Sequence, residues 1–115
     1  NKTLSHPASV DSTTTSAGQE DFVSMAPWAG QKALKIAENT ATILAIELMV
    51  SASAAQLFLK DSQPSSITRE IFNEVNIYLK YDVGDRPLDK EIQGLKSLII
   101  SGKLTETVES KIELI

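Results

Sequence analysis

The sequence contains no cysteine, one histidine, four prolines and five glycines among its 115 residues. Without cysteine there is neither a disulfide framework nor a cysteine-ligated zinc site, and the single histidine, His6, cannot assemble a metal site from imidazoles. Basic residues are also in the minority: eleven lysines and arginines stand against fifteen acidic residues, and no basic patch is visible. We therefore predict neither a bound metal ion nor a nucleic-acid partner.

The longest apolar run indicates a helix over about residues 27–60. Between Ile43 and Leu59 the only charged residue is Glu47, and neither proline nor glycine occurs in this stretch after Gly30. The run is too long for one strand, and its alanine, leucine and methionine favour a helix. A helix that is apolar nearly all round is buried on all sides or spans a membrane. Glu47 leaves apolar segments shorter than the roughly 20 residues that a bilayer needs, so we predict no membrane. We predict instead the central helix of a bundle that this chain cannot complete alone, and a salt bridge for Glu47.

No alternating strand pattern is convincing anywhere in the chain, so the predicted fold is all-α, with shorter helices packed on the long one. Residues 1–18, rich in serine and threonine, are predicted to be a loop or extended segment, and residues 19–115 a helical region. Pro27 implies a break between the long helix and a short helix at 19–25. The further helices are expected at 66–78, at 89–102 with Asp89 as its cap and Gly102 as its end, and at 104–109. Arg86 is expected to pair with Asp85 in the preceding loop.

The segment before the long helix resembles a known family. Residues 5–12, Ser-His-Pro-Ala-Ser-Val-Asp-Ser, and residues 15–25, Thr-Ser-Ala-Gly-Gln-Glu-Asp-Phe-Val-Ser-Met, resemble a sequence near the C-terminus of histidine ammonia-lyases. Two later stretches agree with it: Glu38-Asn39 with Leu44-Ala45-Ile46-Glu47, and Asp85-Arg86-Pro87-Leu88. The similarity covers most of the chain, in order and at the family's spacing.

The resemblance implies the C-terminal helical part of a cytoplasmic carbon-nitrogen lyase that eliminates ammonia from L-histidine to give urocanate. Such enzymes use a methylidene-imidazolone (MIO) electrophile, formed autocatalytically from an internal Ala-Ser-Gly. Their long helices pack four subunits into a homotetramer, with active sites built from more than one subunit. No Ala-Ser-Gly occurs in this sequence. We therefore expect a fragment of a larger enzyme that holds no cofactor itself and is inactive alone.

The resemblance assigns a catalytic and substrate-binding role to Glu20, and a part in shaping the substrate pocket to Gln19. A buried carboxylate beside the substrate can accept a hydrogen bond from an imidazole N–H or relay a proton. Relatives that act on phenylalanine or tyrosine tend to carry glutamine at this place, so Glu20 favours histidine as substrate. Without the resemblance, Glu20 is an acidic residue in the first turn of a helix, where the helix dipole favours it.

Two residues depart from the family's pattern, and they leave alternatives open. Phe22 stands where histidine ammonia-lyases usually have histidine, and Gly18 stands where many members have asparagine. One alternative is a lyase or aminomutase of the same family that acts on another amino acid. The other is a non-enzymatic helical oligomerisation module.

Overall fold

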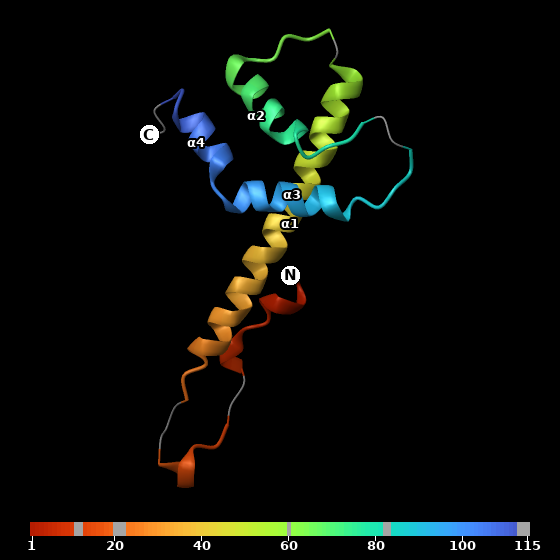
Figure 1. Ribbon diagram of the computed structural model, residues 1–115. Coiled ribbons are helices and arrows are strands. Elements are labelled where there is room, and N and C mark those ends of the chain that lie inside the picture. The colour runs from red at the N-terminus through yellow and green to blue at the C-terminus, as the bar shows by residue number, and fades with distance from the viewer. Residues whose placement is uncertain (11–12, 20–22, 60, 82–83, 113–115) are drawn as a thin grey trace. The chain divides into compact units, whose positions relative to one another are not determined.

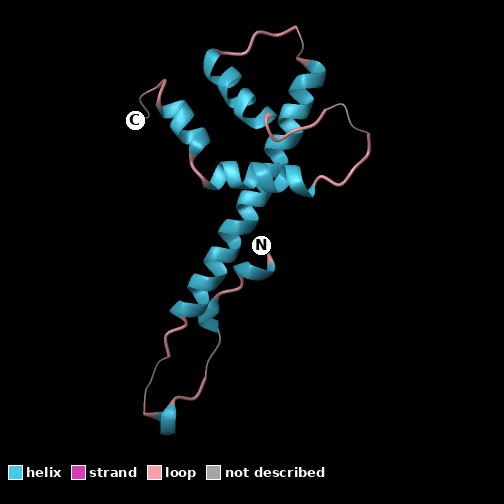
Figure 2. Cartoon of the chain, in the orientation of Figure 1, coloured by secondary structure: helices cyan, strands magenta, loops and turns pink. Residues whose placement is uncertain are grey.

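The computed structural model describes residues 1–10, 13–19, 23–59, 61–81 and 84–112 (Figure 1). Within these ranges every regular element is helical and no strand occurs (Figure 2). The α-helices are α1 (Ala26–Phe58), α2 (Ser66–Asn76), α3 (Asp89–Ile100) and α4 (Lys103–Glu109), and short 3-10 turns lie at Thr3–Ser5, Ala8–Val10 and Ser16–Gly18. The predicted all-α fold with one long helix is confirmed.

Helix α1 is close to the predicted range of 27–60. Its N-terminus lies at Ala26, whose N–H donates to the side-chain oxygen of Ser24 at 3.4 Å. Pro27 occupies the first turn, where its missing N–H removes no helical hydrogen bond. Beyond Gly30 neither glycine nor proline interrupts the helix, which ends at Phe58, before the polar segment 60–65.

The chain divides into two compact units, residues 1–40 and residues 41–115, which are described here one at a time. In the first unit no described side chain is buried. Polar contacts connect its N-terminal segment to α1: the Asn39 amide donates to the side-chain oxygen of Asn1 at 3.0 Å, and the Lys32 ammonium donates to the carbonyl of His6. This unit is therefore held by exposed hydrogen bonds rather than by an apolar core.

The second unit has an apolar core to which three helices contribute. Val75 of α2 and Leu95 of α3 are fully buried, beside Leu98 of α3 and the small residues Ala45 and Ala52 of α1. The two alanines let the neighbouring helices approach α1 closely, and α2, α3 and α4 gather around its C-terminal half (Figure 1). Partly buried side chains pack around this core, among them Leu48, Met49, Ile71, Phe72 and Leu104.

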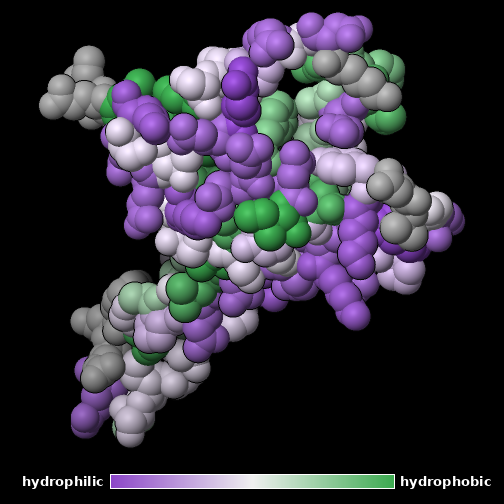
Figure 3. All heavy atoms as spheres, turned by 45° about the horizontal axis from the view of Figure 1, so that its top comes forward, coloured by the Kyte–Doolittle hydropathy of each residue, from purple (hydrophilic) through white to green (hydrophobic). Residues whose placement is uncertain are grey.

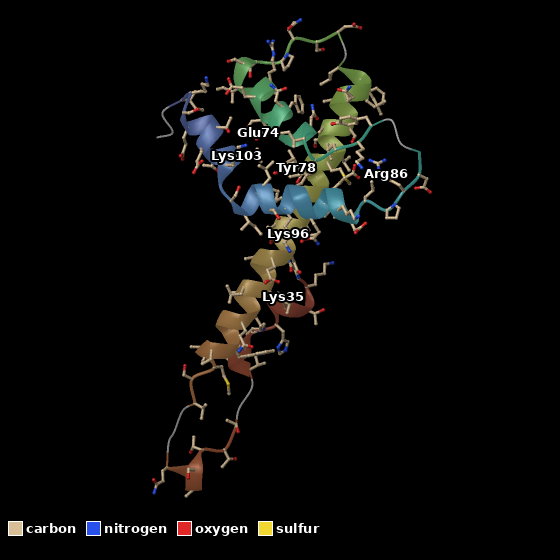
Figure 4. The ribbon with its side chains drawn as sticks, viewed as in Figure 1. Lys35, Glu74, Tyr78, Arg86, Lys96 and Lys103 are labelled. Atoms are coloured by element: carbon tan, nitrogen blue, oxygen red, sulfur yellow. The ribbon has the colours of Figure 1, made fainter. Side chains whose placement is uncertain are left out.

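Ion pairs connect α4 to α2. The Lys103 ammonium pairs with the Glu74 carboxylate, and their side chains meet between the two helices in Figure 4. The Glu74 hydrogen bond raises the pKa of Lys103, so this lysine stays charged over a wider pH range. Nearer the C-terminus, Lys111 pairs with Glu70 at 3.4 Å.

The shorter helices agree with the predicted ranges, and one cap does not. Helix α2 begins after Ser65, whose side-chain oxygen accepts the N–H of Thr68 at 3.2 Å. Gly102 follows α3 with a φ of 77°, the left-handed conformation predicted for it. Asp89, however, is the first residue of α3 and not its cap; the cap position is occupied by Leu88, which provides no side-chain hydrogen bond. Asp89 and Glu91 instead place negative charge in the first turn, where the helix dipole favours it.

The prediction that this chain cannot complete the bundle around α1 is confirmed, because much of the apolar surface of α1 is exposed. Its buried residues are the alanines at 41, 45 and 52, whereas Leu34 is 70% and Phe58 82% exposed. Further large apolar side chains of α1 are exposed, namely Trp28, Ile43, Leu44, Ile46, Val50 and Leu57. Figure 3 shows apolar residues in green among the polar ones on one face. Burial of such a helix requires partners that the described residues do not supply.

By length and composition α1 could also cross a membrane. Core helices of soluble proteins pass the same test, so this property does not separate the two environments. Glu47 is exposed and lies near the middle of the apolar stretch. Its predicted salt bridge is not among the ion pairs of the described residues and stays a prediction.

Candidate active-site segment

The two predicted site residues are adjacent, and the structure describes one of them. Gln19 is exposed, with a backbone conformation of φ −79° and ψ −18°. Glu20 lies outside the described residues, as does Phe22. The short helix expected over 19–25 is not formed by the described residues of that stretch, since neither Gln19 nor 23–25 is helical. The site can therefore be described from the backbone that leads into it.

A sharp turn directly precedes Gln19. Ala17 has φ 55° and ψ 20°, and Gly18 has φ 67°, so two successive residues adopt positive φ. The Gln19 N–H donates to the Ser16 carbonyl at 3.2 Å, and the Gly18 N–H donates to the Thr15 carbonyl at 3.1 Å. This is the pattern of a type I′ turn, which reverses the direction of the chain. The reversal explains why no helix continues from Ser16 through Gln19.

A positive φ costs alanine more conformational free energy than it costs glycine. Gly18 adopts the left-handed region without a steric penalty, whereas an alanine there loses roughly 1–2 kcal/mol to contact between its Cβ and the following carbonyl. Asparagine is the other residue that tolerates this region well. The glycine at position 18, where asparagine was expected, is therefore compatible with the same turn. In the sequence, Gly18 is the residue that indicates this turn, whereas the positive φ of Ala17 has no such signal.

A groove of about 490 Å³ also lies within residues 1–40. It is lined by Lys2, Thr3, Leu4, His6, Trp28 and Lys32. Trp28 is half-exposed there, so within this chain it is not a core residue. No group of three or more histidine, cysteine, aspartate or glutamate residues that could hold a metal ion occurs among the described residues.

A second polar cluster lies in the other unit, at the first turn of α3. The Glu91 side chain is buried, and its Oε1 accepts hydrogen bonds from Arg86 Nη2 at 2.6 Å and from the Lys80 N–H at 2.9 Å. Burial alone would raise the pKa of Glu91, but the hydrogen bonds from Arg86 and Lys80 outweigh it and lower that pKa. The other oxygen, Oε2, is buried and accepts no hydrogen bond from the described residues.

This cluster corrects the pairing predicted for Arg86. Among the described residues Arg86 forms an ion pair with Glu91 and none with Asp85, which is exposed. Water screens the attraction between an exposed aspartate and a guanidinium. A buried carboxylate attracts the guanidinium more strongly, because the effective dielectric constant around it is lower. The neighbouring groove, of about 530 Å³, is mostly apolar and is lined by residues of α1, such as Met49, Val50 and Leu57. We interpret the cluster as an anchor that fixes Arg86 and the backbone at Lys80 to α3.

Comparison with known proteins identifies the segment that contains the turn. A family model described as aromatic amino acid lyase matches residues 1–77, a range that includes the turn, Gln19, Glu20 and all of α1. The chain belongs to the aromatic amino acid lyase family. The resemblance found in the sequence is thereby confirmed.

Several curated members of the aromatic amino acid lyase family are similar over nearly the whole chain. The histidine ammonia-lyase of Natranaerobius thermophilus is 41% identical over 112 residues, which are 97% of this chain and 22% of the relative. Histidine ammonia-lyase 1 of Fusobacterium nucleatum is 39% identical over the same shares. The human histidine ammonia-lyase is 34% identical over 113 residues, 98% of this chain and 17% of its own length. The chain thus spans about a fifth of the length of these lyases and corresponds to part of such an enzyme.

Proposed function

We propose that this chain is part of a histidine ammonia-lyase, which eliminates ammonia from L-histidine to give urocanate. The observation that carries the proposal is the similarity to enzymes of that name along 97% of the chain. The range matched by the family model includes Gln19 and Glu20. We propose that these two residues are the part of the active site that this chain contributes. The parent enzyme is proposed to be cytoplasmic and tetrameric.

The chain supplies no electrophile. The MIO group proposed for the parent enzyme requires an Ala-Ser-Gly sequence, which does not occur among these 115 residues. The residues present therefore do not fit this group. In this proposal the group forms elsewhere in the parent enzyme, and the 115-residue chain alone is inactive.

The proposed role of Glu20 follows from the chemistry of a carboxylate beside an imidazole. It can accept a hydrogen bond from an imidazole N–H and so orient histidine, and it can take up or return a proton when its pKa is close to the working pH. The amide of Gln19 can both donate and accept hydrogen bonds at the edge of the same pocket. These roles also explain a preference for histidine over substrates with hydrocarbon rings.

The test is ammonia release by the full-length protein that contains this chain, with histidine, tyrosine and phenylalanine offered separately. We expect release from histidine, accompanied by the absorbance of urocanate. Glu20→Ala should lower kcat about 10²–10⁴-fold, the range found for general acid–base groups, while the oligomer stays intact. Glu109→Ala, which removes a carboxylate of α4 outside the matched range, is the control.

Each other outcome has a distinct meaning. Unchanged turnover by Glu20→Ala removes this residue from the mechanism. Release from tyrosine or phenylalanine alone keeps the family and replaces the substrate, with Phe22→His as the next variant to measure. No release from any of the three amino acids contradicts the proposed activity.

The exposed apolar surface of α1 favours one alternative, a helical oligomerisation module without catalysis. It predicts that the 115-residue chain self-associates, which light scattering at increasing concentration detects. The two proposals differ in the gene: only the enzyme requires an Ala-Ser-Gly codon sequence in the same reading frame. A reading frame without this sequence would contradict the enzyme and favour the oligomerisation module.

A further inference from the structure

The groove beside Glu47 combines apolar side chains with a carboxylate. Leu44, Glu47, Leu48 and Ser51 of α1 and Ile99 of α3 surround a hollow of about 400 Å³. Leu44 is 45% exposed, and Glu47 is exposed as well. Glu47 forms no ion pair with any other residue of the described ranges. Such a hollow suits a partner that brings both apolar side chains and a positive charge.

Lys96 places the opposite charge on the neighbouring surface of α3. It lies three residues before Ile99, a spacing that brings two side chains next to each other on a helix. Ile100, four residues after Lys96, is 64% exposed. In Figure 4 Lys96 lies on the side of α3 opposite to Glu74. Lys96, too, forms no ion pair within the part of the chain that the structure describes.

A partner that covers this surface has to satisfy both charges, because a charge that loses its water without gaining a counter-charge is strongly destabilising. The partner must therefore present a base to Glu47 and an acid to Lys96. A second copy of the same surface supplies both at once. In a twofold interface residue i of one copy contacts residue j of the other, and j contacts i. The two charges and the apolar side chains beside them thus form a self-complementary set.

We propose that this surface is a twofold interface with a second copy of the chain, in which Glu47 of each copy pairs with Lys96 of the other. The interface would cover the exposed side chains of Leu44 and Ile100 together with the two charges. Charged pairs across an interface fix its register, whereas apolar contacts alone leave the two copies freer to rotate. This inference rests on the proposed function only in assigning the chain to an oligomer, and it requires no catalysis.

The experiment uses this reciprocity with two charge reversals in the full-length protein that contains this chain. Glu47→Lys sets two lysines against each other at both contacts of a symmetric pair, and Lys96→Glu sets two glutamates there. Each variant alone should dissociate with a Kd raised at least about 100-fold, measured by light scattering after size exclusion. When the two variants are mixed, each contact again joins a lysine and a glutamate. The mixture should therefore associate with a Kd within about tenfold of the parent's.

Lys90→Glu and Glu109→Lys are the matched controls. They reverse exposed charges of α3 and α4 outside the groove, and both should keep the parent's Kd, alone and mixed. If a reversal does not fold, as circular dichroism shows, Glu47→Gln and Lys96→Gln repeat the test without introducing a new charge. Each should raise the Kd about tenfold, and the double variant should raise it no further, because all three lose the same pairs.

Two results overturn the inference. If either reversal associates as tightly as the parent, a second copy does not cover this surface. If the mixture stays dissociated, the pairs are not reciprocal, and association of one chain that carries both reversals then shows that Glu47 and Lys96 pair within the same copy. Ammonia release from histidine is measured on the same samples. An active parent whose mixed variants stay apart overturns the interface alone, whereas a mixture that associates, from a parent that releases no ammonia, overturns the proposed activity alone.

Discussion

The two units of the chain are stabilised in opposite ways. Residues 41–115 bury apolar side chains, among them Val75 and Leu95, and the carboxylate of Glu91, which pairs with the partly exposed Arg86. Residues 1–40 bury no described side chain and are connected by hydrogen bonds between exposed groups. The unit that contains the proposed site residues is the one without a core. Active-site segments are commonly loops whose geometry is maintained by a rigid scaffold, and here the first unit provides little of that scaffold itself.

This difference indicates that residues 1–40 depend on other parts of the protein for their stability. Exposed hydrogen bonds contribute little because water competes for both partners. Segments with few buried apolar contacts open at low free energy. The chain spans about a fifth of the length of its relatives. A parent enzyme of that length would supply further packing partners for residues 1–40. The predictions below therefore compare the same kind of change in the two units of this chain.

The largest difference is expected from removing a leucine in each unit. Leu95 is fully buried, so Leu95→Ala loses its transfer free energy and leaves a cavity; we expect about 3–4 kcal/mol less free energy of unfolding. Leu34 is 70% exposed, and Leu34→Ala should change that free energy by less than about 0.5 kcal/mol. Urea unfolding of the 115-residue chain, followed by circular dichroism, measures both. Equal losses for the two variants would contradict the contrast between the units.

The second comparison uses the buried polar cluster of residues 41–115. Arg86→Ala leaves the carboxylate of Glu91 buried without its cation, and because Arg86 is itself partly exposed we expect a loss of about 2–3 kcal/mol at pH 7. Glu91→Gln keeps an acceptor for the Lys80 N–H and removes the buried charge, so its loss should be nearer 1 kcal/mol.

The stability of Glu91→Gln should depend less on acid than the stability of the parent chain. The pKa of Glu91 is lower in the folded chain than its ordinary value. The stabilisation by its charged form is therefore complete above the ordinary glutamate pKa and decreases as the pH falls through the lowered pKa. Urea midpoints measured at pH 7, 4 and 3 should fall less steeply for Glu91→Gln than for the parent. Parallel curves would show that Glu91 does not contribute to the acid sensitivity.

The comparison of units also explains what the sequence could predict. Helix α1 follows from an uninterrupted apolar stretch without glycine or proline after Gly30, and the end of α3 follows from Gly102. Both are local features that act within a few residues. The family was likewise visible in the residues around Gln19 and Glu20, because a motif is a property of the sequence itself.

The features that the sequence did not predict depend on residues that are distant in the chain. Arg86 was assigned to Asp85, its neighbour in the chain, because the burial of Glu91 in α3 cannot be read from the loop. The apolar sequence of α1 predicts that the helix needs partners, but it does not identify them. The left-handed Ala17 was missed because alanine ordinarily prefers the right-handed region.

The smallest effect is expected from an ion pair of the first unit. Lys35 and Glu38 lie 3.3 Å apart at the positions i and i+3 of α1, with side chains that are 60% and 59% exposed. At such exposure the attraction is screened by water and offset by the entropy of ordering two long side chains. Lys35→Gln should therefore lower the free energy of unfolding by about 0.3 kcal/mol or less, and salt at 1 M should abolish even that difference. A loss as large as that of Arg86→Ala would mean that charge stabilises residues 1–40 as strongly as burial stabilises residues 41–115, and the contrast between the two units would then be wrong.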